Sequence, residues 1–191
     1  MSSNRKTEAE TFLNLLILGE SGVGKSTLIN SIANYFTYNS FEDAKGQKPV
    51  CMIPASFLMR DSDFNTYTVT IGEPVNDELT QSPRTYNFRH PQCQINFINV
   101  SGIGDPRGIV HDRENIKAML DTVSVFKEIH AICILLKSTD TKLTPDYRLY
   151  LDALFLHLHQ NAIPNVVFVF TNSQATDFVP ENAEVVLKAY L

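Results

Sequence analysis

A glycine-rich stretch near the N-terminus carries residues whose types and spacing suit the binding of phosphate groups. It reads Gly19-Glu20-Ser21-Gly22-Val23-Gly24-Lys25-Ser26-Thr27 and fits the pattern G-x-x-x-x-G-K followed by Ser or Thr. Glycines let the backbone curl until successive N–H groups point toward phosphate oxygens. We expect Lys25 to reach the β- and γ-phosphates of a nucleotide and the Ser26 hydroxyl to ligate Mg²⁺, with all of residues 20–27 lining the site.

The residues on either side predict the strand and the helix that position such a loop. Phe12–Leu18 is apolar and predicts a buried strand leading into the loop, while Thr27–Asn34 has apolar residues at helical spacing. A helix that begins at the loop adds the partial positive charge of its N-terminus to the phosphate site. The alternative is a glycine-rich turn with an incidental lysine, and the flanking strand and helix argue against it.

The composition excludes several other classes of protein. A length of 191 residues with 43% hydrophobic and 19% charged residues fits one soluble α/β domain. The net charge of −5 argues against nonspecific binding to nucleic acid or to anionic membranes. No apolar run reaches the roughly 20 residues of a transmembrane helix. Three widely spaced cysteines give neither a disulfide framework nor a metal-ligand spacing, so we expect a reducing, cytoplasmic location.

Strands and helices are predicted to alternate along the rest of the chain. Short strands are expected at 66–71, 85–89 and 94–100, and the continuous apolar runs 131–136 and 166–170 predict strands buried on both faces. Helices are expected over 113–129 with Asp112 as N-cap, over 145–161 after the Thr144-Pro145 start signal, and over 180–191.

This alternation predicts a three-layer α/β domain with a mostly parallel central sheet over residues 12–191, preceded by a flexible arm over residues 1–11. Nucleotide-binding domains of this type usually carry one more strand and a closing helix. The pattern ends before there is room for them, so we expect a domain that is incomplete at its C-terminus or completed by something else.

Residues after the strand at 94–100 bear on magnesium binding. GTPases carry D-x-x-G here, and this chain has Asn99-Val100-Ser101-Gly102. We expect the Gly102 amide to meet a γ-phosphate, and Asn99 to accept a hydrogen bond from a magnesium-bound water without adding negative charge. The missing charge predicts weaker Mg²⁺ binding. Asp105 offers partial compensation, with a loop-capping acid as the alternative interpretation.

Two further positions bear on hydrolysis. GTPases close a threonine over Mg²⁺ and the γ-phosphate, and Thr80 is our candidate, with Thr85 as the second. Ile103 stands where Ras-like enzymes hold a glutamine that orients the attacking water. Because an apolar side chain cannot polarise water, we expect slow intrinsic hydrolysis.

The expected base-binding segment follows the run 166–170. Guanine specificity normally comes from N/T-K-x-D, whose aspartate accepts hydrogen bonds from the base. This chain has Thr171-Asn172-Ser173-Gln174, so the lysine is replaced by Asn172 and the aspartate by Gln174. Asp177 lies three residues later and needs a loop bulge to serve. We expect Thr171, Asn172 and Gln174 to lie near the base.

Over residues 12–180 the chain resembles the septin-like and immunity-associated (paraseptin) branch of GTPases. The resemblance rests on the phosphate-binding loop, on Gly102-Ile103-Gly104-Asp105, and on the Thr171-Asn172 pair. It implies binding of GTP or GDP with Mg²⁺, slow hydrolysis, and nucleotide-dependent self-association as a homodimer or larger assembly across the nucleotide face. Asn99-Val100-Ser101 departs from the D-T-P of that branch.

The leading hypothesis is therefore a GTP-binding assembly switch with weak GTPase activity. A nucleotide-binding scaffold without hydrolysis is the alternative that Asn99 and Ile103 support. A small-molecule P-loop kinase is the third, and it needs an arginine-rich lid. The stretch 137–148 holds only Lys137, Lys142 and Arg148 as basic residues.

Overall fold

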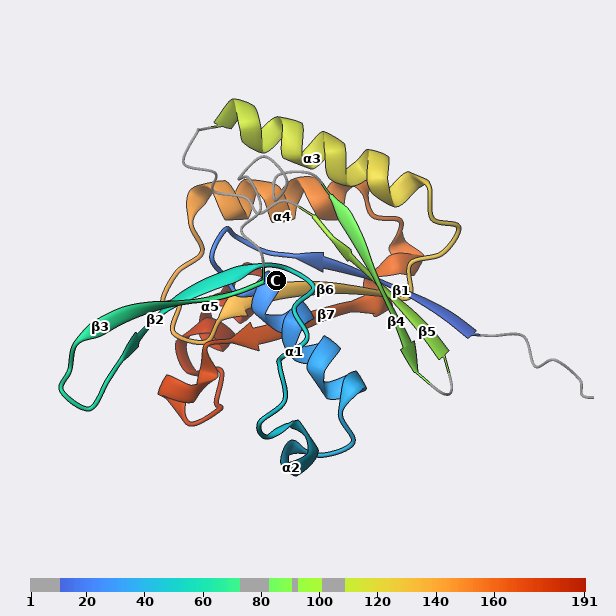
Figure 1. Ribbon diagram of the computed structural model, residues 1–191. Helices are drawn as coiled ribbons and strands as arrows, with labels where there is room; N and C mark the ends of the chain where they lie inside the picture. The colour runs from blue at the N-terminus through green and yellow to red at the C-terminus, as the bar shows by residue number, and fades with distance from the viewer. Residues whose placement is uncertain (1–10, 73–82, 91–92, 101–108) are drawn as a thin grey trace, which may run out of the picture.

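The computed structural model describes residues 11–72, 83–90, 93–100 and 109–191, and its centre is a five-stranded sheet (Figure 1). The strands follow the order β4-β5-β1-β6-β7. Neighbours pair in parallel except β4, which runs antiparallel to β5. The sheet is formed by β1 (Thr11–Leu18), β4 (Arg84–His90), β5 (Cys93–Asn99), β6 (Ala131–Lys137) and β7 (Val166–Thr171).

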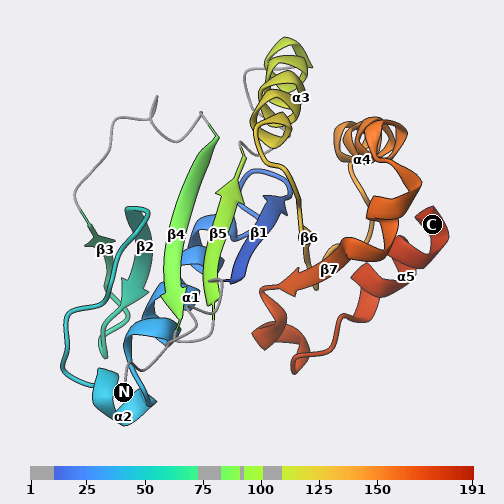
Figure 2. The same cartoon turned by 90° about the vertical axis from the view of Figure 1, so that its right-hand side faces the viewer.

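Helices cover both faces of this sheet, which confirms the predicted three-layer α/β fold (Figure 2). One face packs against α3 (Ile109–Ser124), α4 (Pro145–His157) and α5 (Glu181–Tyr190), and the other face packs against α1 (Lys25–Thr37). A short helix α2 (Phe41–Ala44) and the 3₁₀ segments η2 (Gln160–Asn165) and η3 (Ser173–Thr176) complete the described helices. None of them combines the length and hydrophobicity needed to span a bilayer.

The strand β6 shows why a continuous apolar run forms the middle of this fold. Ile132, Ile134 and Leu136 enter the core under α3, α4 and α5, while Cys133 and Leu135 enter the core under α1. Side chains of a strand alternate between the two faces of the sheet, so a strand covered on both faces needs apolar residues at every position. The predicted burial of 131–136 on both faces is confirmed.

Two helix boundaries differ from the sequence-based expectation. The helix α3 begins at Ile109, so Asp112 lies within it and is not its N-cap. It ends at Ser124, short of the expected 113–129, because the following residues bind β1: Asn14 Nδ2 donates to the Glu128 carbonyl at 2.8 Å, and His130 N donates to the Asn14 carbonyl at 2.8 Å. These contacts hold residues 128–130 against β1 before β6 begins.

The helix α4 begins as predicted and ends early. The Thr144 hydroxyl accepts a hydrogen bond from Tyr147 N at 3.2 Å, which confirms Thr144 as N-cap. The helix ends at His157 because Leu158 is extended, and η2 with Pro164 inside it follows. A proline inside an α-helix removes a backbone donor and clashes with the preceding turn, so it disfavours continuation of α4.

Residues between α1 and β4 form a separate antiparallel hairpin of β2 (Ala55–Arg60) and β3 (Thr66–Ile71), which projects from the domain in Figure 1. The sequence predicted β3 and missed β2. The run Phe57-Leu58-Met59 interrupts the alternation of apolar and polar residues that marks a strand exposed on one face.

The register of the parallel strands brings their carboxyl ends together at one edge. Asn99 at the end of β5 lies beside Ile17 of β1, and Thr171 at the end of β7 lies beside Lys137 of β6. The glycine-rich loop leaves this same edge after Leu18. In open α/β sheets, ligands bind at this edge where the chain connections reverse direction.

Candidate functional site

The glycine-rich loop turns sharply between β1 and α1, and its glycines make this turn possible. Gly22 and Gly24 have φ angles of 73° and 106°, a region that other residues rarely adopt. A Cβ atom on Gly19 would lie 2.8 Å from Val23 Cγ1 and 3.0 Å from the Leu135 carbonyl oxygen. Gly19 is therefore required by close packing against β6 as well as by its φ of 150°.

The helix α1 presents an uncapped N-terminus at the loop. Gly24 is its N-cap residue, no side chain hydrogen-bonds to the cap, and no acidic residue stands in the first turn. The first N–H groups of a helix have no partner within the helix and carry a partial positive charge. This end of α1 is thus built to accept an anion. Ser26 is half-buried in the first turn, while Ser21 and Thr27 are exposed.

Lys25 is a buried cation at the centre of the loop. Its side chain is 9% exposed, and its ammonium donates to the carbonyl oxygens of Gly19 at 2.8 Å and Glu20 at 2.9 Å. Burial lowers the pKa of Lys25 to about 8, although the Glu20 carboxylate acts in the opposite direction. A buried charge is costly without a counter-charge, and carbonyl oxygens provide only dipoles. A phosphate group would provide the missing negative charge.

The Glu20 side chain connects the loop to α4. The Thr144 hydroxyl donates a hydrogen bond to the Glu20 carboxylate, and the same hydroxyl caps α4 by accepting from Tyr147 N. The Tyr147 hydroxyl in turn donates to the Leu135 carbonyl at 3.0 Å. The loop is therefore fixed relative to both α4 and β6.

Asn99 ends β5 with a buried acceptor that has no donor among the described residues. Its Oδ1 atom is inaccessible to solvent and makes no hydrogen bond to the described residues. Buried polar atoms are almost always satisfied, so such an atom needs an explanation. Asn99 lies next to Ile17, two residues before the glycine-rich loop. A water molecule bound to Mg²⁺ is a donor of the kind that this oxygen lacks, so the residues present fit the ion.

Thr171 joins the predicted base-binding segment to the loop. Its hydroxyl donates to the Val23 carbonyl at 2.6 Å, with the Leu136 carbonyl as a second acceptor at 3.2 Å. A Cβ atom on Gly24 would lie 3.7 Å from the Thr171 side chain. The structure thus places Thr171 against the phosphate-binding loop, 148 residues away from Val23 in sequence.

Ser138 and Thr176 organise the same segment, and the sequence pattern indicated neither. Ser138 is completely buried, its hydroxyl donates to the Asn172 carbonyl at 3.2 Å, and Thr176 Oγ1 donates to Ser138 Oγ at 3.2 Å. Asn172 has a φ of 52°, in the left-handed region that asparagine tolerates better than most residues. The only sequence signal for Ser138 was a small polar residue directly after a buried strand.

The candidate base-reading residues Gln174 and Asp177 are both exposed. Gln174 lies in η3, and Asp177 is the residue that follows this 3₁₀ segment. Asp177 has a φ of 50°, in the left-handed region, so the 3₁₀ segment ends there. The described contacts bring Thr171 to the loop and show no comparable contact for the Gln174 side chain.

Other predicted site residues lie outside the described residues. These are Thr80 and Gly102, together with Ile103 and Asp105. Thr85, the second candidate for the magnesium threonine, lies within β4 opposite Ile98 of β5. Within the described ranges, no group of three His, Cys, Asp or Glu side chains could hold a metal ion.

Comparison with known proteins identifies the fold. No family model and no curated protein matches this sequence. Among solved structures, Toc33 from Arabidopsis thaliana in complex with Mg²⁺ and GMPPNP is 15% identical, with a TM-score of 0.59 over 95% of this chain and 62% of that chain. Era in complex with MgGDPNP and a segment of 16S ribosomal RNA is 16% identical, with a TM-score of 0.50 over 96% of this chain and 49% of that one.

A further solved structure concerns the chloroplast translocon components atToc33 and psToc159, for which dimerization is described as important for GTPase activity. It is 14% identical, with a TM-score of 0.60 over 95% of this chain and 61% of that chain. The chain thus spans about three fifths of the length of the Toc33 chains that it matches. At these identities the likeness shows the fold, which is the α/β fold expected from the sequence.

Replacing Thr171 with valine tests its link to the loop. Thr171→Val keeps the shape of the side chain but removes the hydroxyl. The Val23 carbonyl then loses its hydrogen bond from residue 171. We expect a loss of about 1 to 2 kcal/mol in the free energy of unfolding, measured by urea denaturation. We also expect faster hydrogen exchange in residues 20–25. Thr171→Ser retains the hydroxyl and is the control; equal stability of the two variants would contradict the link.

Proposed function

We propose that this chain is a guanine-nucleotide-binding protein that holds GTP or GDP with Mg²⁺ at the carboxyl edge of its sheet. The observation that carries the proposal is the buried Lys25 ammonium beside the uncapped N-terminus of α1, which together form a site for a polyphosphate. The fold likeness supports it, since the Toc33 structures include complexes with Mg²⁺ and either GMPPNP or GDP.

Each part of the site has a separate role in this proposal. Residues 20–27 surround the phosphates with backbone N–H groups, and Lys25 exchanges its carbonyl partners for phosphate oxygens. Ser26 and Thr80 ligate Mg²⁺, Asn99 accepts a hydrogen bond from a metal-bound water, and Gly102 meets the γ-phosphate. Bound Mg²⁺ neutralises phosphate charge. Thr171, Asn172 and Gln174 border the base.

The proposed hydrolysis is slow. Because residue 99 is an asparagine, no carboxylate at this position holds the waters bound to Mg²⁺. Because residue 103 is an isoleucine, it offers no amide to orient the attacking water. A scaffold that binds nucleotide without hydrolysis is the second candidate, and the neutral Asn99 side chain is the observation that favours it. Single-turnover hydrolysis of bound GTP separates the two: a clear rate that disappears in Lys25→Ala would exclude the scaffold.

Nucleotide-dependent self-association across the nucleotide face completes the proposal. It rests on the motif resemblance to septin-like and immunity-associated GTPases, and dimerization of Toc33 is consistent with it. The three cysteines are free thiols, which fits the cytoplasmic location that we propose.

The direct test is to identify the nucleotide that purified protein carries. We expect guanine nucleotide on extraction followed by mass spectrometry, and tighter binding of GDP than of ADP in calorimetry. Lys25→Ala should lose at least about 100-fold in affinity, because it removes a buried charge that contacts phosphate. Lys142→Ala, which removes an exposed lysine, is the matched control. Unchanged affinity in Lys25→Ala would contradict the proposal.

The lowered pKa of Lys25 predicts how binding depends on pH. Phosphate favours the charged ammonium, whereas the free protein favours the neutral amine above pH of about 8. GDP affinity should therefore be flat below pH 8 and fall up to about tenfold per pH unit above it. Between pH 8 and the usual lysine pKa of 10.5, the unfolded chain keeps the Lys25 proton and the folded chain has lost it. The free energy of unfolding of the nucleotide-free protein should therefore rise with pH over this range.

Calorimetry between pH 7 and 9 measures this dependence. Lys25→Arg is the matched control, because a guanidinium keeps its charge over the whole range and should give a flat profile. If the original chain and Lys25→Arg show the same pH profile, a group other than Lys25 causes the pH dependence.

Restoring the carboxylate at position 99 tests the role of that residue. Asn99→Asp should tighten Mg²⁺ binding and raise the single-turnover rate, each by about tenfold, since a charged acceptor roughly doubles the strength of the hydrogen bond to a metal-bound water. The Mg²⁺ dependence of nucleotide release gives the first quantity. Asn87→Asp, at an exposed position of β4, is the control. If neither quantity changes, Asn99 does not serve the metal.

A further inference from the structure

Three polar side chains are buried among the described residues, tyrosine and cysteine aside. Lys25 belongs to the glycine-rich loop. The other two are Ser138, which is 0% exposed, and Thr176, which is 9% exposed, and we call them the hydroxyl pair. Removing a hydroxyl from water is costly unless it finds hydrogen-bond partners in the protein. The partners of the pair therefore show which part of the chain it holds in place.

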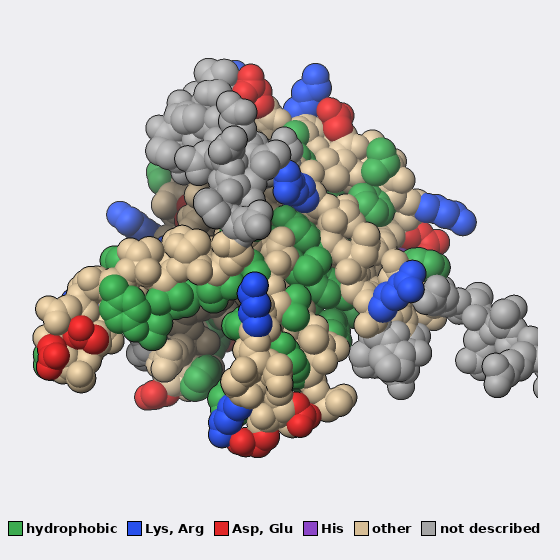
Figure 3. Space-filling view, in the orientation of Figure 1, with side chains coloured by type: hydrophobic (Ala, Val, Ile, Leu, Met, Phe, Trp, Pro, Cys, Tyr) green, Lys and Arg blue, Asp and Glu red, His purple; other side chains and the backbone are tan. Residues whose placement is uncertain are grey.

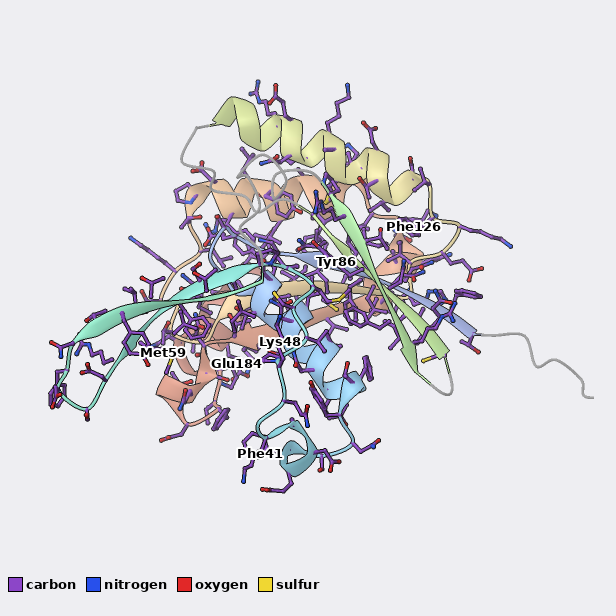
Figure 4. All side chains as sticks on the ribbon, in the orientation of Figure 1. Phe41, Lys48, Met59, Tyr86, Phe126 and Glu184 are labelled. Carbon is purple, nitrogen blue, oxygen red and sulfur yellow. The ribbon has the colours of Figure 1, made fainter. Side chains whose placement is uncertain are left out.

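Ser138 connects the end of β6 to the segment that follows β7. It stands directly after β6, and its N–H donates to the Thr171 carbonyl at 2.9 Å. Its hydroxyl donates to the Asn172 carbonyl at 3.2 Å. Residues 172–179, which we call the β7–α5 loop, lead from β7 toward α5, on which Figure 4 labels Glu184. Ser138 therefore fixes the point where this loop begins.

Thr176 holds the same loop from within. Its hydroxyl donates to the Ser138 hydroxyl at 3.2 Å, and the carbonyls of Val179 at 2.7 Å and Ser173 at 3.1 Å are further acceptors. Because Ser173 stands near the start of the loop and Val179 at its end, one hydroxyl joins the two ends. The hydroxyl pair thus forms a connected network in the interior, where hydrogen bonds are stronger than in water.

The β7–α5 loop has a backbone that needs such support. Asn172, Asp177 and Phe178 have φ angles of 52°, 50° and 62°, in the left-handed region. Asparagine and aspartate tolerate this region, whereas a bulky residue such as phenylalanine rarely adopts it. A backbone of this kind persists only where the surrounding structure imposes it. The hydroxyl pair, together with the hydrogen bond from Phe178 N to the Ser173 carbonyl at 2.8 Å, provides that constraint.

The loop keeps its other polar side chains available to a ligand. Asn172, Gln174 and Asp177 are exposed, and their amide and carboxylate groups can donate to or accept from the edge of a base. The loop begins at Thr171, whose hydroxyl binds the Val23 carbonyl of the glycine-rich loop. A backbone that is fixed before the ligand arrives need not be ordered by binding, so it costs less affinity.

Charge offers no substitute for directed hydrogen bonds at this loop. Asp177 is the only charged residue within 172–179. Its carboxylate repels phosphate but can accept hydrogen bonds from the N–H groups of a base. On the face shown in Figure 3, the lysine and arginine side chains of the described residues lie at separate places and do not gather in a patch. Recognition by this loop therefore depends on how its backbone is held.

Residues 50–53 offer a comparison, because side chains of α1 hold their backbone. Asn34 accepts from Val50 N at 2.9 Å and donates to the Val50 carbonyl at 2.8 Å, and Asn30 donates to the Ile53 carbonyl at 2.7 Å. Both asparagines are half-buried, and the segment that they hold leads into the β2–β3 hairpin. The hydroxyl pair differs in being buried and in holding a segment that leaves the carboxyl edge of the sheet.

We propose that Ser138 and Thr176 are positioning residues of the nucleotide site, which hold the β7–α5 loop in the form that binds the base. This role rests on the proposed function and adds to it two buried residues that act through the loop backbone. Loss of either hydroxyl weakens the contribution of the base to binding and leaves the contribution of the phosphates unchanged.

Calorimetry with GDP and with inorganic pyrophosphate, which has the two phosphates of GDP and no base, tests this role. Ser138→Ala and Thr176→Val should each weaken GDP binding about tenfold, because binding must then order the loop. The affinity for pyrophosphate should stay the same. Thr176→Val keeps the shape of its side chain and supplies the test if Ser138→Ala does not fold.

Two control variants separate this role from a general loss of stability. Thr176→Ser keeps the hydroxyl and should bind GDP like the original chain. Thr122→Val removes a half-buried hydroxyl that donates to the Ala118 carbonyl of α3 at 2.7 Å, and it should leave GDP binding unchanged. If Thr122→Val weakens GDP binding as much as Thr176→Val does, the positioning role is wrong.

The two ligands also distinguish failure of this role from failure of the proposed function. An equal loss for GDP and pyrophosphate in the variants, or a loss for neither, would overturn the positioning role and leave the proposed function standing. An original chain that binds pyrophosphate as tightly as GDP would likewise overturn it, because the base then contributes nothing. An original chain that binds neither ligand would contradict the proposed function itself, and the positioning role with it.

Discussion

The arrangement of the site depends on one buried charge, the Lys25 ammonium. It can be enclosed only because the loop backbone turns inward to offer it the carbonyls of Gly19 and Glu20. That turn requires Gly19 to pack against β6 without a side chain, and it is held by Thr171 from β7 and by Thr144 from α4. Three elements distant in sequence therefore fix the path of one short loop, which leaves the lysine beside the N-terminus of α1.

In the proposed function, the site combines residues well suited to phosphate with residues less suited to metal and base recognition. The loop residues fit a polyphosphate in type, burial and charge. At the end of β5, Asn99 offers a neutral acceptor that has no donor among the described residues, and after β7 the exposed Gln174 stands in the candidate base-binding segment. Under the proposed function, these two positions bear on turnover and base selectivity, while the loop residues bear on the binding of phosphate.

The sequence predicted the parts of the fold that local pattern determines. The strand–loop–helix unit at 12–34, the buried strand at 131–136 and the position of the strand at 166–170 follow from apolar runs and glycine spacing alone. The predicted burial of 166–170 on both faces is wrong, because β7 lies at the edge of the sheet and Val167 is 46% exposed. Contacts between distant segments determined what was missed. The early end of α3 depends on the hydrogen bonds of Asn14 with Glu128 and His130, and the role of Ser138 depends on Asn172 and Thr176. Neither has a local signature. The sequence did not predict β2, because its consecutive apolar residues Phe57, Leu58 and Met59 do not alternate with polar ones. They lie on alternate faces of a hairpin that is exposed on both faces.

The asparagine pair on α1 has a mechanical consequence. Asn30 lies five residues after Lys25, about one and a half helical turns or roughly 7.5 Å along the axis. The same helix therefore carries Lys25, the proposed phosphate ligand, at its start and the anchor of the hairpin in its second turn. A tilt or rotation of α1 at the loop must move residues 50–53 with it, since the hydrogen bonds from Asn30 and Asn34 to this segment would otherwise strain. Movement of α1 would therefore couple the position of the glycine-rich loop to the position of the hairpin.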